Sequence, residues 1–350
     1  MVFSQAEIED FRTDCFAADV AYNYDVLKNW DEDKIRDFFD NGGGGEGAAP
    51  SVDVSDAGGD AGGDDPFKKT IPAEVLFRMN DDKTVAVITL NRPDAKNAIN
   101  DNMTAGMSIA MERIKATPSM RVAFLTGNGN MFCAGGDPKK FQEAQEQGKA
   151  AAAAGGKDEN ASGAITFAEF LNELDQLPVY TVALVNGSAM GGGFGFLCCC
   201  DCVIAKKTAF FALSEVKLGV IPATISPYVL AKIGPGNARR LFMTGETVNG
   251  DKGMSIGLVQ EVVATNEELL KKAQEICDVM TLAAPGAVAA AKSLVRNVQY
   301  KPIEKELMQY TAAQLSAVRM SEESASGMAA VQSGKKAPWA ANPLKMPPTA

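Results

Sequence analysis

The stretch "VYTVALVNGSAMGGGFGFLCCCDCVIA", residues 179–205, combines the signals of a strand, a turn, a helix and a second strand. Its first nine residues form an apolar run rich in β-branched side chains, which is typical of a buried strand. Three consecutive glycines follow, then a fourth glycine at position 195 and four cysteines within five positions. A strand that leads through a glycine-rich turn into a helix predicts an α/β fold.

The same succession of elements occurs earlier in the chain. Residues 84–90 and 121–127 are short apolar runs that predict buried strands, and residues 101–118 between them predict a helix. Residues 145–163, "QEQGKAAAAAGGKDENASG", are low in complexity, and we expect a mobile surface loop there. After residue 224 the pattern is mainly helical, which predicts a C-terminal helical subdomain.

The composition divides the chain into four parts. Residues 1–65 contain 17 acidic and 4 basic side chains, although the formal net charge of the whole chain is only -10. Apolar positions among these acids predict an acidic helical extension over residues 1–40, and residues 41–65 are a Gly/Asp-rich stretch typical of a flexible linker. We expect the α/β core over residues 66–265 and the helical region over residues 266–350. The extension either packs on a subunit of the same protein or binds a protein partner.

The rest of the chain is nearly neutral, with 27 acidic and 30 basic side chains after residue 65. No Lys/Arg stripe stands out, so we expect no nucleic-acid partner. No run of about 18 apolar residues occurs, so we expect no membrane span. The first residues have neither the pattern of a secretory signal nor that of a transit peptide, and a cytoplasmic location is therefore the expectation.

No histidine occurs anywhere in the 350 residues. This absence excludes Ser-His-Asp and Cys-His catalytic groups, zinc sites with histidine ligands and imidazole general bases. Acid-base chemistry near neutral pH has to use carboxylates, Lys, Tyr or Cys side chains, or a group of the substrate itself.

The seven cysteines do not have the pattern of a disulfide framework or of a metal site. Their number is odd, and four of them lie between residues 198 and 202, where neighbours cannot easily pair with each other. On a helix, Cys198, Cys199 and Cys200 point about 100° apart, so they cannot converge on one ion. We expect them to fill the interior around a buried helix, and we expect no metal.

Two glycine-bearing turns follow buried strands in the same way, at "FLTGNGNMFCAGGD" (124–137) and "ALVNGSAMGGGFG" (183–195). A turn without side chains leaves backbone N–H groups free to face a ligand oxygen, above all where a helix begins just beyond. Two such donors form an oxyanion hole, in which one donor is typically worth about 3 to 4 kcal/mol. Ordinary tight connections between strand and helix are the alternative. Neither turn has the pattern of a P-loop or of a dinucleotide-binding site.

Five segments resemble, in the same order, the enoyl-CoA hydratase/isomerase (crotonase) superfamily. They are "ITLNRPDAKNAIN" (88–100), "FLTGNGNMFCAGGD" (124–137), "VNGSAMGGGFGFLCCCDCVIA" (185–205), "FALSEVKLGVIP" (211–222) and "LFMTGETVNGDKGMSIGLVQEVV" (241–263). The resemblance implies an α/β fold in which β-β-α repeats form a spiral. It also implies C-terminal helices that take part in subunit contacts, in a homotrimer or in a homohexamer built as a dimer of trimers.

The resemblance implies an acyl-CoA thioester as substrate, with coenzyme A as part of that substrate and no permanently bound cofactor. The oxyanion hole would consist of the backbone N–H groups of Gly136 and Gly192. The coenzyme A site would be lined by Lys96, Asn97, Ala98, Cys133, Ala134 and Asp137. A helix cap is the alternative role for Asp137.

Hydratases of this superfamily place two glutamates beside the reacting carbons. The first lies three residues after the second glycine of the triplet, and the other follows twenty residues later. In this chain those positions are Gly195 and Glu215, so one of the two carboxylates is missing. Glu215 is the expected general acid/base, and burial among apolar neighbours should raise its pKa. A purely structural glutamate is the alternative.

These features predict an enoyl-CoA hydratase-like lyase. The segment "PATISPYVLAKIG" (222–234) resembles the branch of methylglutaconyl-CoA hydratases, which favours a branched acyl group and a place in leucine degradation or fatty acid metabolism. Two alternatives stay open. One is an enoyl-CoA isomerase or decarboxylase that uses the same site, and the other is a non-catalytic protein of this fold with residues 1–40 as a docking element.

Overall fold

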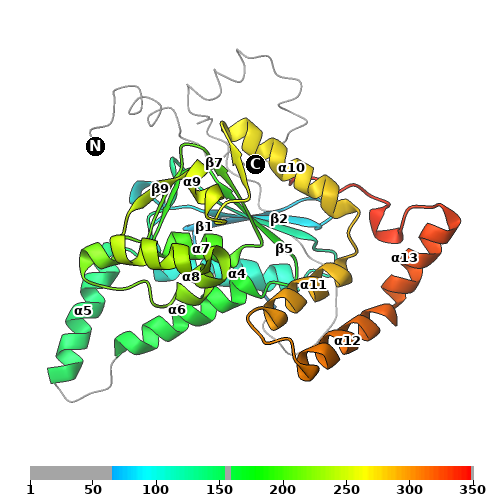
Figure 1. Cartoon of the computed structure of the whole chain (residues 1–350). Helices are drawn as coiled ribbons and strands as arrows, with labels where there is room; N and C mark the ends of the chain where they lie inside the picture. Colours follow the sequence, from blue (N-terminus) through cyan, green and yellow to red (C-terminus); the bar gives the residue numbers. More distant parts are fainter. Residues whose placement is uncertain (1–64, 154–158, 348–350) are drawn as a thin grey trace, which may run out of the picture.

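The computed structural model describes residues 65–153 and 159–347 of the chain (Figure 1). The predicted extension over residues 1–40 and all but the last residue of the predicted linker lie outside the described residues. The remaining chain forms two sheets, with helices packed around them and further helices at its C-terminal end.

The larger sheet has six strands in the order β1-β2-β3-β5-β7-β10. β1 pairs with β2 in antiparallel fashion, and each of the other neighbours pairs in parallel. The strands are β1 (Val75–Met79), β2 (Val85–Leu90), β3 (Val122–Gly127), β5 (Tyr180–Val185), β7 (Cys202–Lys206) and β10 (Glu261–Val263).

The smaller sheet has four strands in the order β4-β6-β8-β9. They are β4 (Met131–Cys133), β6 (Ser188–Met190), β8 (Phe210–Ala212) and β9 (Thr247–Asn249). The chain alternates between the sheets, because β3 leads to β4, β5 leads to β6 and β7 leads to β8. Each of these pairs is followed by a helix. This confirms the predicted spiral of β-β-α repeats.

Helices surround both sheets and continue beyond them (Figure 1). They are α4 (Asp101–Lys115), α5 (Pro138–Ala153), α6 (Glu159–Asp175), α7 (Gly192–Cys199), α8 (Ser226–Thr244), α9 (Gly250–Ser255), α10 (Asn266–Thr281), α11 (Pro285–Val298), α12 (Lys305–Arg319) and α13 (Glu322–Ser333). Three short 3-10 helices cover Pro93–Ala95, Ser214–Leu218 and Pro338–Ala340.

The expectation of a loop over residues 145–163 was wrong for most of that segment. Residues 145–153 belong to α5, and residues 159–163 belong to α6. The segment is rich in Ala, Gln, Lys and Glu, which have high helix propensity, so low complexity did not mean irregular backbone here.

Both faces of the larger sheet are buried along its central strands β2, β3, β5 and β7. Along β2, Ala86, Ile88 and Leu90 join one hydrophobic cluster, whereas Val85 and Val87 join another that contains residues of α10. Successive side chains of a strand point to opposite faces, so two-sided burial requires apolar residues at every position. This explains why the strands are continuous apolar runs in the sequence.

Of the last three helices, α11 lies beside β5, and α12 and α13 extend away from the sheets (Figure 1). α11 and α12 contain no buried residue, and α13 contains one, Ala330. Apolar side chains on and beside them are strongly exposed, among them Ile303 (84%), Met320 (85%) and Val331 (76%). In the described part of the chain no single helix is both long and apolar enough to cross a membrane, and only the pair α10–α11, bent by 106°, passes that test.

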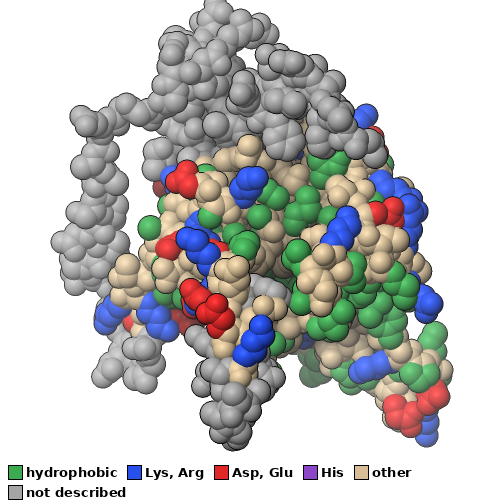
Figure 2. Space-filling view, turned by 90° about the vertical axis from the view of Figure 1, so that its left-hand side faces the viewer, with side chains coloured by type: hydrophobic (Ala, Val, Ile, Leu, Met, Phe, Trp, Pro, Cys, Tyr) green, Lys and Arg blue, Asp and Glu red, His purple; other side chains and the backbone are tan. Residues whose placement is uncertain are grey.

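Side chains next to β3 and on α13 form hydrogen bonds with the connection between α10 and α11. Arg121 donates to the carbonyl oxygens of Met280 (2.8 Å) and Ala283 at the end of α10. The carboxylate of Glu323 accepts hydrogen bonds of 2.9 Å from the N–H groups of Gly286 and Ala287, at the start of α11. Figure 2 shows another face of the molecule, on which many apolar side chains gather among scattered charged ones.

Candidate active site

Three turns lie side by side at one edge of the smaller sheet. β4, β6 and β8 are parallel neighbours, so their carboxyl ends meet at the same edge. β4 runs into the turn 134–137 before α5, β6 runs into Gly191 before α7, and β8 runs into the 3-10 helix that carries Glu215. The topology therefore brings together the two predicted glycine turns and the predicted catalytic glutamate.

The first two turns touch each other through glycines. Gly135 has a φ of +92° and Gly191 a φ of +49°, in the region that favours glycine. A Cβ atom on Gly135 would lie 2.9 Å from the carbonyl oxygen of Met190 and 3.6 Å from the Cα of Gly191. A side chain at Gly135 would push the turns apart, and one at Gly191 would press on Glu215 and strain the backbone at its positive φ.

The predicted oxyanion donors are placed so that their N–H groups are free of the local backbone pairing. In the parallel bridge between Ile99 and Gly136, the N–H of Ile99 donates to the carbonyl of Gly135, and the N–H of Asp137 donates to the carbonyl of Ile99. The N–H of Gly136 takes no part in this bridge. Gly192 is the first residue of α7, where N–H groups have no partner within the helix and the helix dipole favours negative charge. Both donors can therefore serve a ligand oxygen.

Glu215 lies against the second turn. Its Oε1 atom would be 3.2 Å from a Cβ on Gly191, and among the described residues its buried Oε2 atom has no hydrogen-bond partner. Burial raises the pKa of this carboxyl above its ordinary value, while a hydrogen bond to its own backbone opposes the rise. The expected direction of the pKa shift is confirmed, and the site contains a carboxyl that can hold or release a proton.

One side of α7 consists of glycine at successive turns and is covered by side chains from other elements. Gly192 faces apolar groups, because a Cβ there would lie 2.7 Å from Cδ1 of Ile99 and 3.5 Å from the ring of Phe167. Gly195 faces Ile225, whose Cγ2 atom would be only 2.4 Å from a Cβ. Sequence reasoning identified the missing carboxylate at position 195 but did not identify Ile225, which comes 30 residues later.

Arg92 and Asp137 connect the segment 92–99 to the first turn. Arg92 donates to Asp137 (3.0 Å) and to the carbonyl of Ala98, and Asp137 also accepts a bond from the N–H of Lys139 in the first turn of α5. Although burial acts to raise the pKa of Asp137, its bonds from Lys139 and Arg92 hold that pKa below its usual range. Asp137 thus caps a helix, as the alternative interpretation supposed, and pairs with an arginine that sequence reasoning missed.

Asn97 holds the same segment in shape. It is fully buried with a φ of +53°, and its amide donates to the carbonyls of Asn128 (2.8 Å) and Met131 (2.7 Å). Its side-chain oxygen accepts from the N–H of Arg92. All these bonds are internal, which makes Asn97 a residue that positions the backbone around the site.

The other predicted coenzyme A residues differ in exposure. Lys96 is exposed and Ala134 is half-buried, so both offer surface near the first turn. Ala98 is buried, and Cys133 is fully buried against α7, where a Cβ on Gly193 would lie 2.6 Å from the Cβ of Cys133. The Cys133 side chain thus has no surface for a ligand, although its backbone leads into the turn.

The cysteines around α7 are interior side chains. Cys198, Cys199 and Cys200 are free and buried, and burial raises the pKa of Cys200 to about 12. Over residues 65–153 and 159–347, no three side chains of His, Cys, Asp or Glu are grouped so that they could hold a metal ion.

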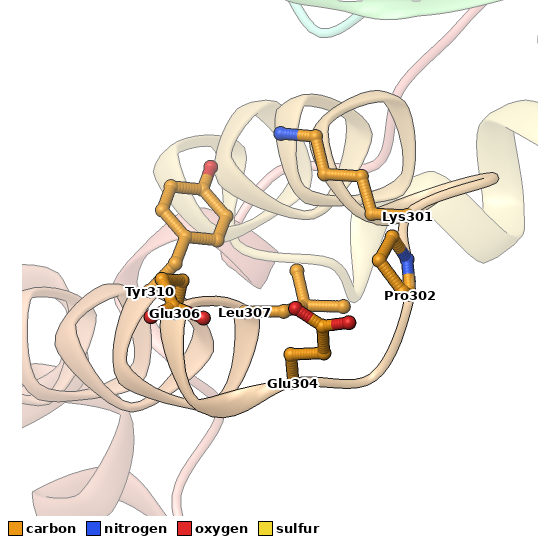
Figure 3. A pocket seen from close by; sticks show the side chains of 6 residues that line it. All are labelled: Lys301, Pro302, Glu304, Glu306, Leu307 and Tyr310. Carbon is orange, nitrogen blue, oxygen red and sulfur yellow. The ribbon is translucent and has the colours of Figure 1, made fainter.

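Two cavities lie away from the glycine turns. One of about 520 Å³ is lined by residues of α7, α8 and α11, among them Lys232 and Lys292, and Lys292 pairs with Asp201 at 2.8 Å. The other, of about 240 Å³, lies at the connection between α11 and α12 (Figure 3). All of its lining residues come from positions 301–310, with the Lys301 amine 5.9 Å from the ring centre of Tyr310, so it is a local feature of that connection.

Comparison with known proteins places these features in a family. A model of the enoyl-CoA hydratase/isomerase family matches residues 80–342. Enoyl-CoA hydratase AFT6-1 of Alternaria alternata is 30% identical over 214 residues, which cover 61% of this chain and 66% of that protein. Carnitinyl-CoA dehydratase of Proteus mirabilis (strain HI4320) is 36% identical over 224 residues, which cover 63% of this chain and 80% of that protein.

Solved structures agree with this match. An enoyl-CoA hydratase from Shewanella pealeana ATCC 700345 is 30% identical and has a TM-score of 0.70, over 76% of this chain and 96% of the other. The span of the family model contains all three turns at the edge of the smaller sheet. The predicted fold class is thereby confirmed, and the chain belongs to the enoyl-CoA hydratase/isomerase family.

Proposed function

We propose that this protein interconverts a 2-enoyl-CoA and a 3-hydroxyacyl-CoA, with Glu215 as its general acid/base. The observation that carries the proposal is the Glu215 carboxyl beside the glycine turns, which has a buried oxygen without a hydrogen-bond partner in the described part of the chain. A buried polar atom without a partner costs free energy, and such atoms with a shifted pKa are typical of catalytic sites. The relatives named hydratase and dehydratase support the same reaction class.

In this proposal the substrate's thioester oxygen accepts hydrogen bonds from the N–H groups of Gly136 and Gly192. These donors stabilise the negative charge that develops when a proton leaves Cα. Glu215 takes that proton and then gives it to the hydroxyl leaving from Cβ, which departs as water. The carboxylate is regenerated, so a single side chain can serve both steps. Lys96 is exposed beside the first turn, and its charge suits a phosphate group of coenzyme A.

Replacing Glu215 tests the proposal directly. We expect Glu215→Gln to lower kcat by about 100-fold to 10,000-fold, since it keeps the shape of the side chain and removes its acid-base function. Crotonyl-CoA and 3-methylglutaconyl-CoA are the probe substrates, and hydration is followed by the mass of the product. Glu267→Gln, an exposed change on α10, is the matched control and should leave turnover intact. Full turnover by Glu215→Gln contradicts the proposal.

A double-bond shift is the second candidate reaction. The observation that favours it is Ile225, which covers Gly195 with apolar atoms where a second polar group would otherwise be placed. A 3-enoyl-CoA substrate separates the two reactions, because isomerisation leaves the mass unchanged and hydration adds one water. A 3-carboxy thioester tests the decarboxylase alternative in the same assay, through loss of carbon dioxide.

The acyl group and the assembly also belong to the proposal. The segment 222–234 favours a branched acyl group of the methylglutaconyl type, which the substrate comparison above tests. We infer that three copies of the chain associate through the helices α11–α13. The exposed apolar side chains of Ile303, Met320 and Val331 support such a contact.

A further inference from the structure

Glu215 and Ile225 cover two glycines at the start of α7. Gly191 is the N-cap of α7, and Gly195 follows it by four residues and donates its N–H to the carbonyl of Gly191 at 3.1 Å. Glu215 covers Gly191 through Oε1, and Ile225 covers Gly195 through Cγ2. The carboxyl and the isoleucine therefore cover two glycines that are joined by the first hydrogen bond of α7.

Ile225 cannot readily make room at this position. It is 2% exposed, and it directly precedes α8, with its carbonyl accepting a bond of 3.1 Å from the N–H of Val229. Its side chain branches at Cβ, which limits its rotamers, and its Cβ would itself lie 3.0 Å from a Cβ on Gly195. A side chain at position 195 would thus need a shorter residue at position 225.

We propose that Ile225 is a specificity-determining residue that closes the space beside Gly195 and thereby leaves the proton transfers at the acyl chain to Glu215. This inference rests on the proposed function. When the Cα–H bond breaks, the proton bonds to Glu215 and the electron pair enters the enolate held by Gly136 and Gly192. When the Cβ–O bond breaks, Glu215 returns the proton to the leaving oxygen, so no further acid is required.

The covered side of α7 supports this assignment. Next to Gly192 lie Cδ1 of Ile99 and the ring of Phe167, and neither can carry a proton. Glu215 is the one ionisable side chain among the nearest contacts of Gly191, Gly192 and Gly195 in the described residues. Shortening Ile225 should therefore admit a second proton carrier, provided that position 195 supplies it.

The experiment transfers the carboxylate from position 215 to position 195 in the full chain. Glu215→Gln is combined with Gly195→Glu, once with Ile225 intact and once with Ile225→Ala. The matched control combines Glu215→Gln and Ile225→Ala with Gly195→Gln. The glutamine side chain has the size of glutamate and lacks its acid group. Turnover is measured with whichever of crotonyl-CoA and 3-methylglutaconyl-CoA the unmodified protein hydrates.

We expect at least a 10-fold gain over Glu215→Gln only in the chain that combines Gly195→Glu with Ile225→Ala. An equal gain with Ile225 intact overturns the proposal, and so does equal turnover with Gly195→Glu and Gly195→Gln. If the combined variants do not fold, the proposal is tested by the thermal unfolding of milder variants. Gly195→Ala should then lower Tm strongly with Ile225 intact and much less with Ile225→Ala, whereas additive effects overturn the proposal.

Failure of this inference is distinguishable from failure of the proposed function. If Glu215→Gln alone keeps full turnover, Glu215 is not the acid-base group and the proposed function fails first. If Glu215→Gln is inactive while positions 195 and 225 show no coupling, only the assignment of Ile225 fails.

Discussion

Glu215 links catalysis to stability, because its folded environment favours the protonated form. Its pKa lies above the ordinary value of 4.5, so its contribution to stability is fully present below that pH and is lost as the pH rises through the higher folded pKa. At pH 7 we therefore expect Glu215→Gln to unfold at a higher temperature than the unmodified protein. The difference should shrink towards pH 4, and thermal unfolding at both pH values measures it. A lower Tm for the variant at pH 7 contradicts the assignment.

The N–H of Gly136 can be tested by a pair of substitutions at one position. A Cβ on Gly136 meets no protein atom within 4 Å, so the protein itself has room for the Cβ that Ala and Pro share. Gly136→Pro removes the N–H, and we expect it to lower kcat about 100-fold to 1,000-fold further than Gly136→Ala, which keeps that donor. Equal turnover of the two variants would show that this N–H does not act on the thioester. Unchanged thermal unfolding of both variants is the required control.

Single residues show where sequence reasoning was sufficient. Gly136, Gly192 and Glu215 were predicted as one site from their motifs, and the structure places all three turns at one sheet edge. Their catalytic roles stay predictions. Ile225 was not predicted, because its contact with Gly195 depends on how α8 packs on α7, and no local pattern encodes such packing.

At the scale of elements, Arg121 is the point where β3 holds the end of α10. Its hydrogen bonds to carbonyl groups are made by a charged donor, and such bonds contribute about 1.5 to 3 kcal/mol each. We expect Arg121→Met to lower the free energy of unfolding by about 2 to 4 kcal/mol, as measured by urea unfolding. This is less than the sum of the two bonds, because the substitution also removes the buried Nε of Arg121, which has no hydrogen-bond partner among the described residues. Arg121→Lys should lose part of this energy, since an ammonium group lacks the planar fork of the guanidinium. A loss below 0.5 kcal/mol, on the order of a neutral surface change, would contradict the role of this residue.

The elements also show why some expectations failed. The strands could be predicted because two-sided burial makes them continuous apolar runs. Residues 145–153 of α5 and the first turn of α6 were expected as a loop, because their low complexity was given more weight than the helix propensity of Ala, Gln and Lys. The ion pair of Arg92 with Asp137 joins residues 45 positions apart, so only the folded chain reveals it.

At the scale of the whole molecule, the helices α11–α13 carry strongly exposed apolar side chains that no described residue covers. If they form the contact between copies, light scattering should give three times the chain mass of 36.9 kDa, or six times for a dimer of trimers. We expect Met320→Glu combined with Val331→Glu to shift the protein towards the single-chain mass, since both side chains are exposed and apolar. Ser119→Glu, a charge added in the exposed turn before β3, is the control. An unchanged mass for the double variant would place the contact elsewhere.

The buried thiols have a consequence for measuring how this molecule opens. Cys133, Cys200 and Cys277 each have a pKa raised to about 12 by burial, so the reactive thiolate is scarce at neutral pH in the folded chain. A thiol reagent can therefore label them only after the surrounding structure opens, and the labelling rate reports the opening equilibrium. Cys277 lies in α10 and Cys133 next to the glycine turns, so peptide-resolved labelling can time the release of the C-terminal helices separately from the loss of the core.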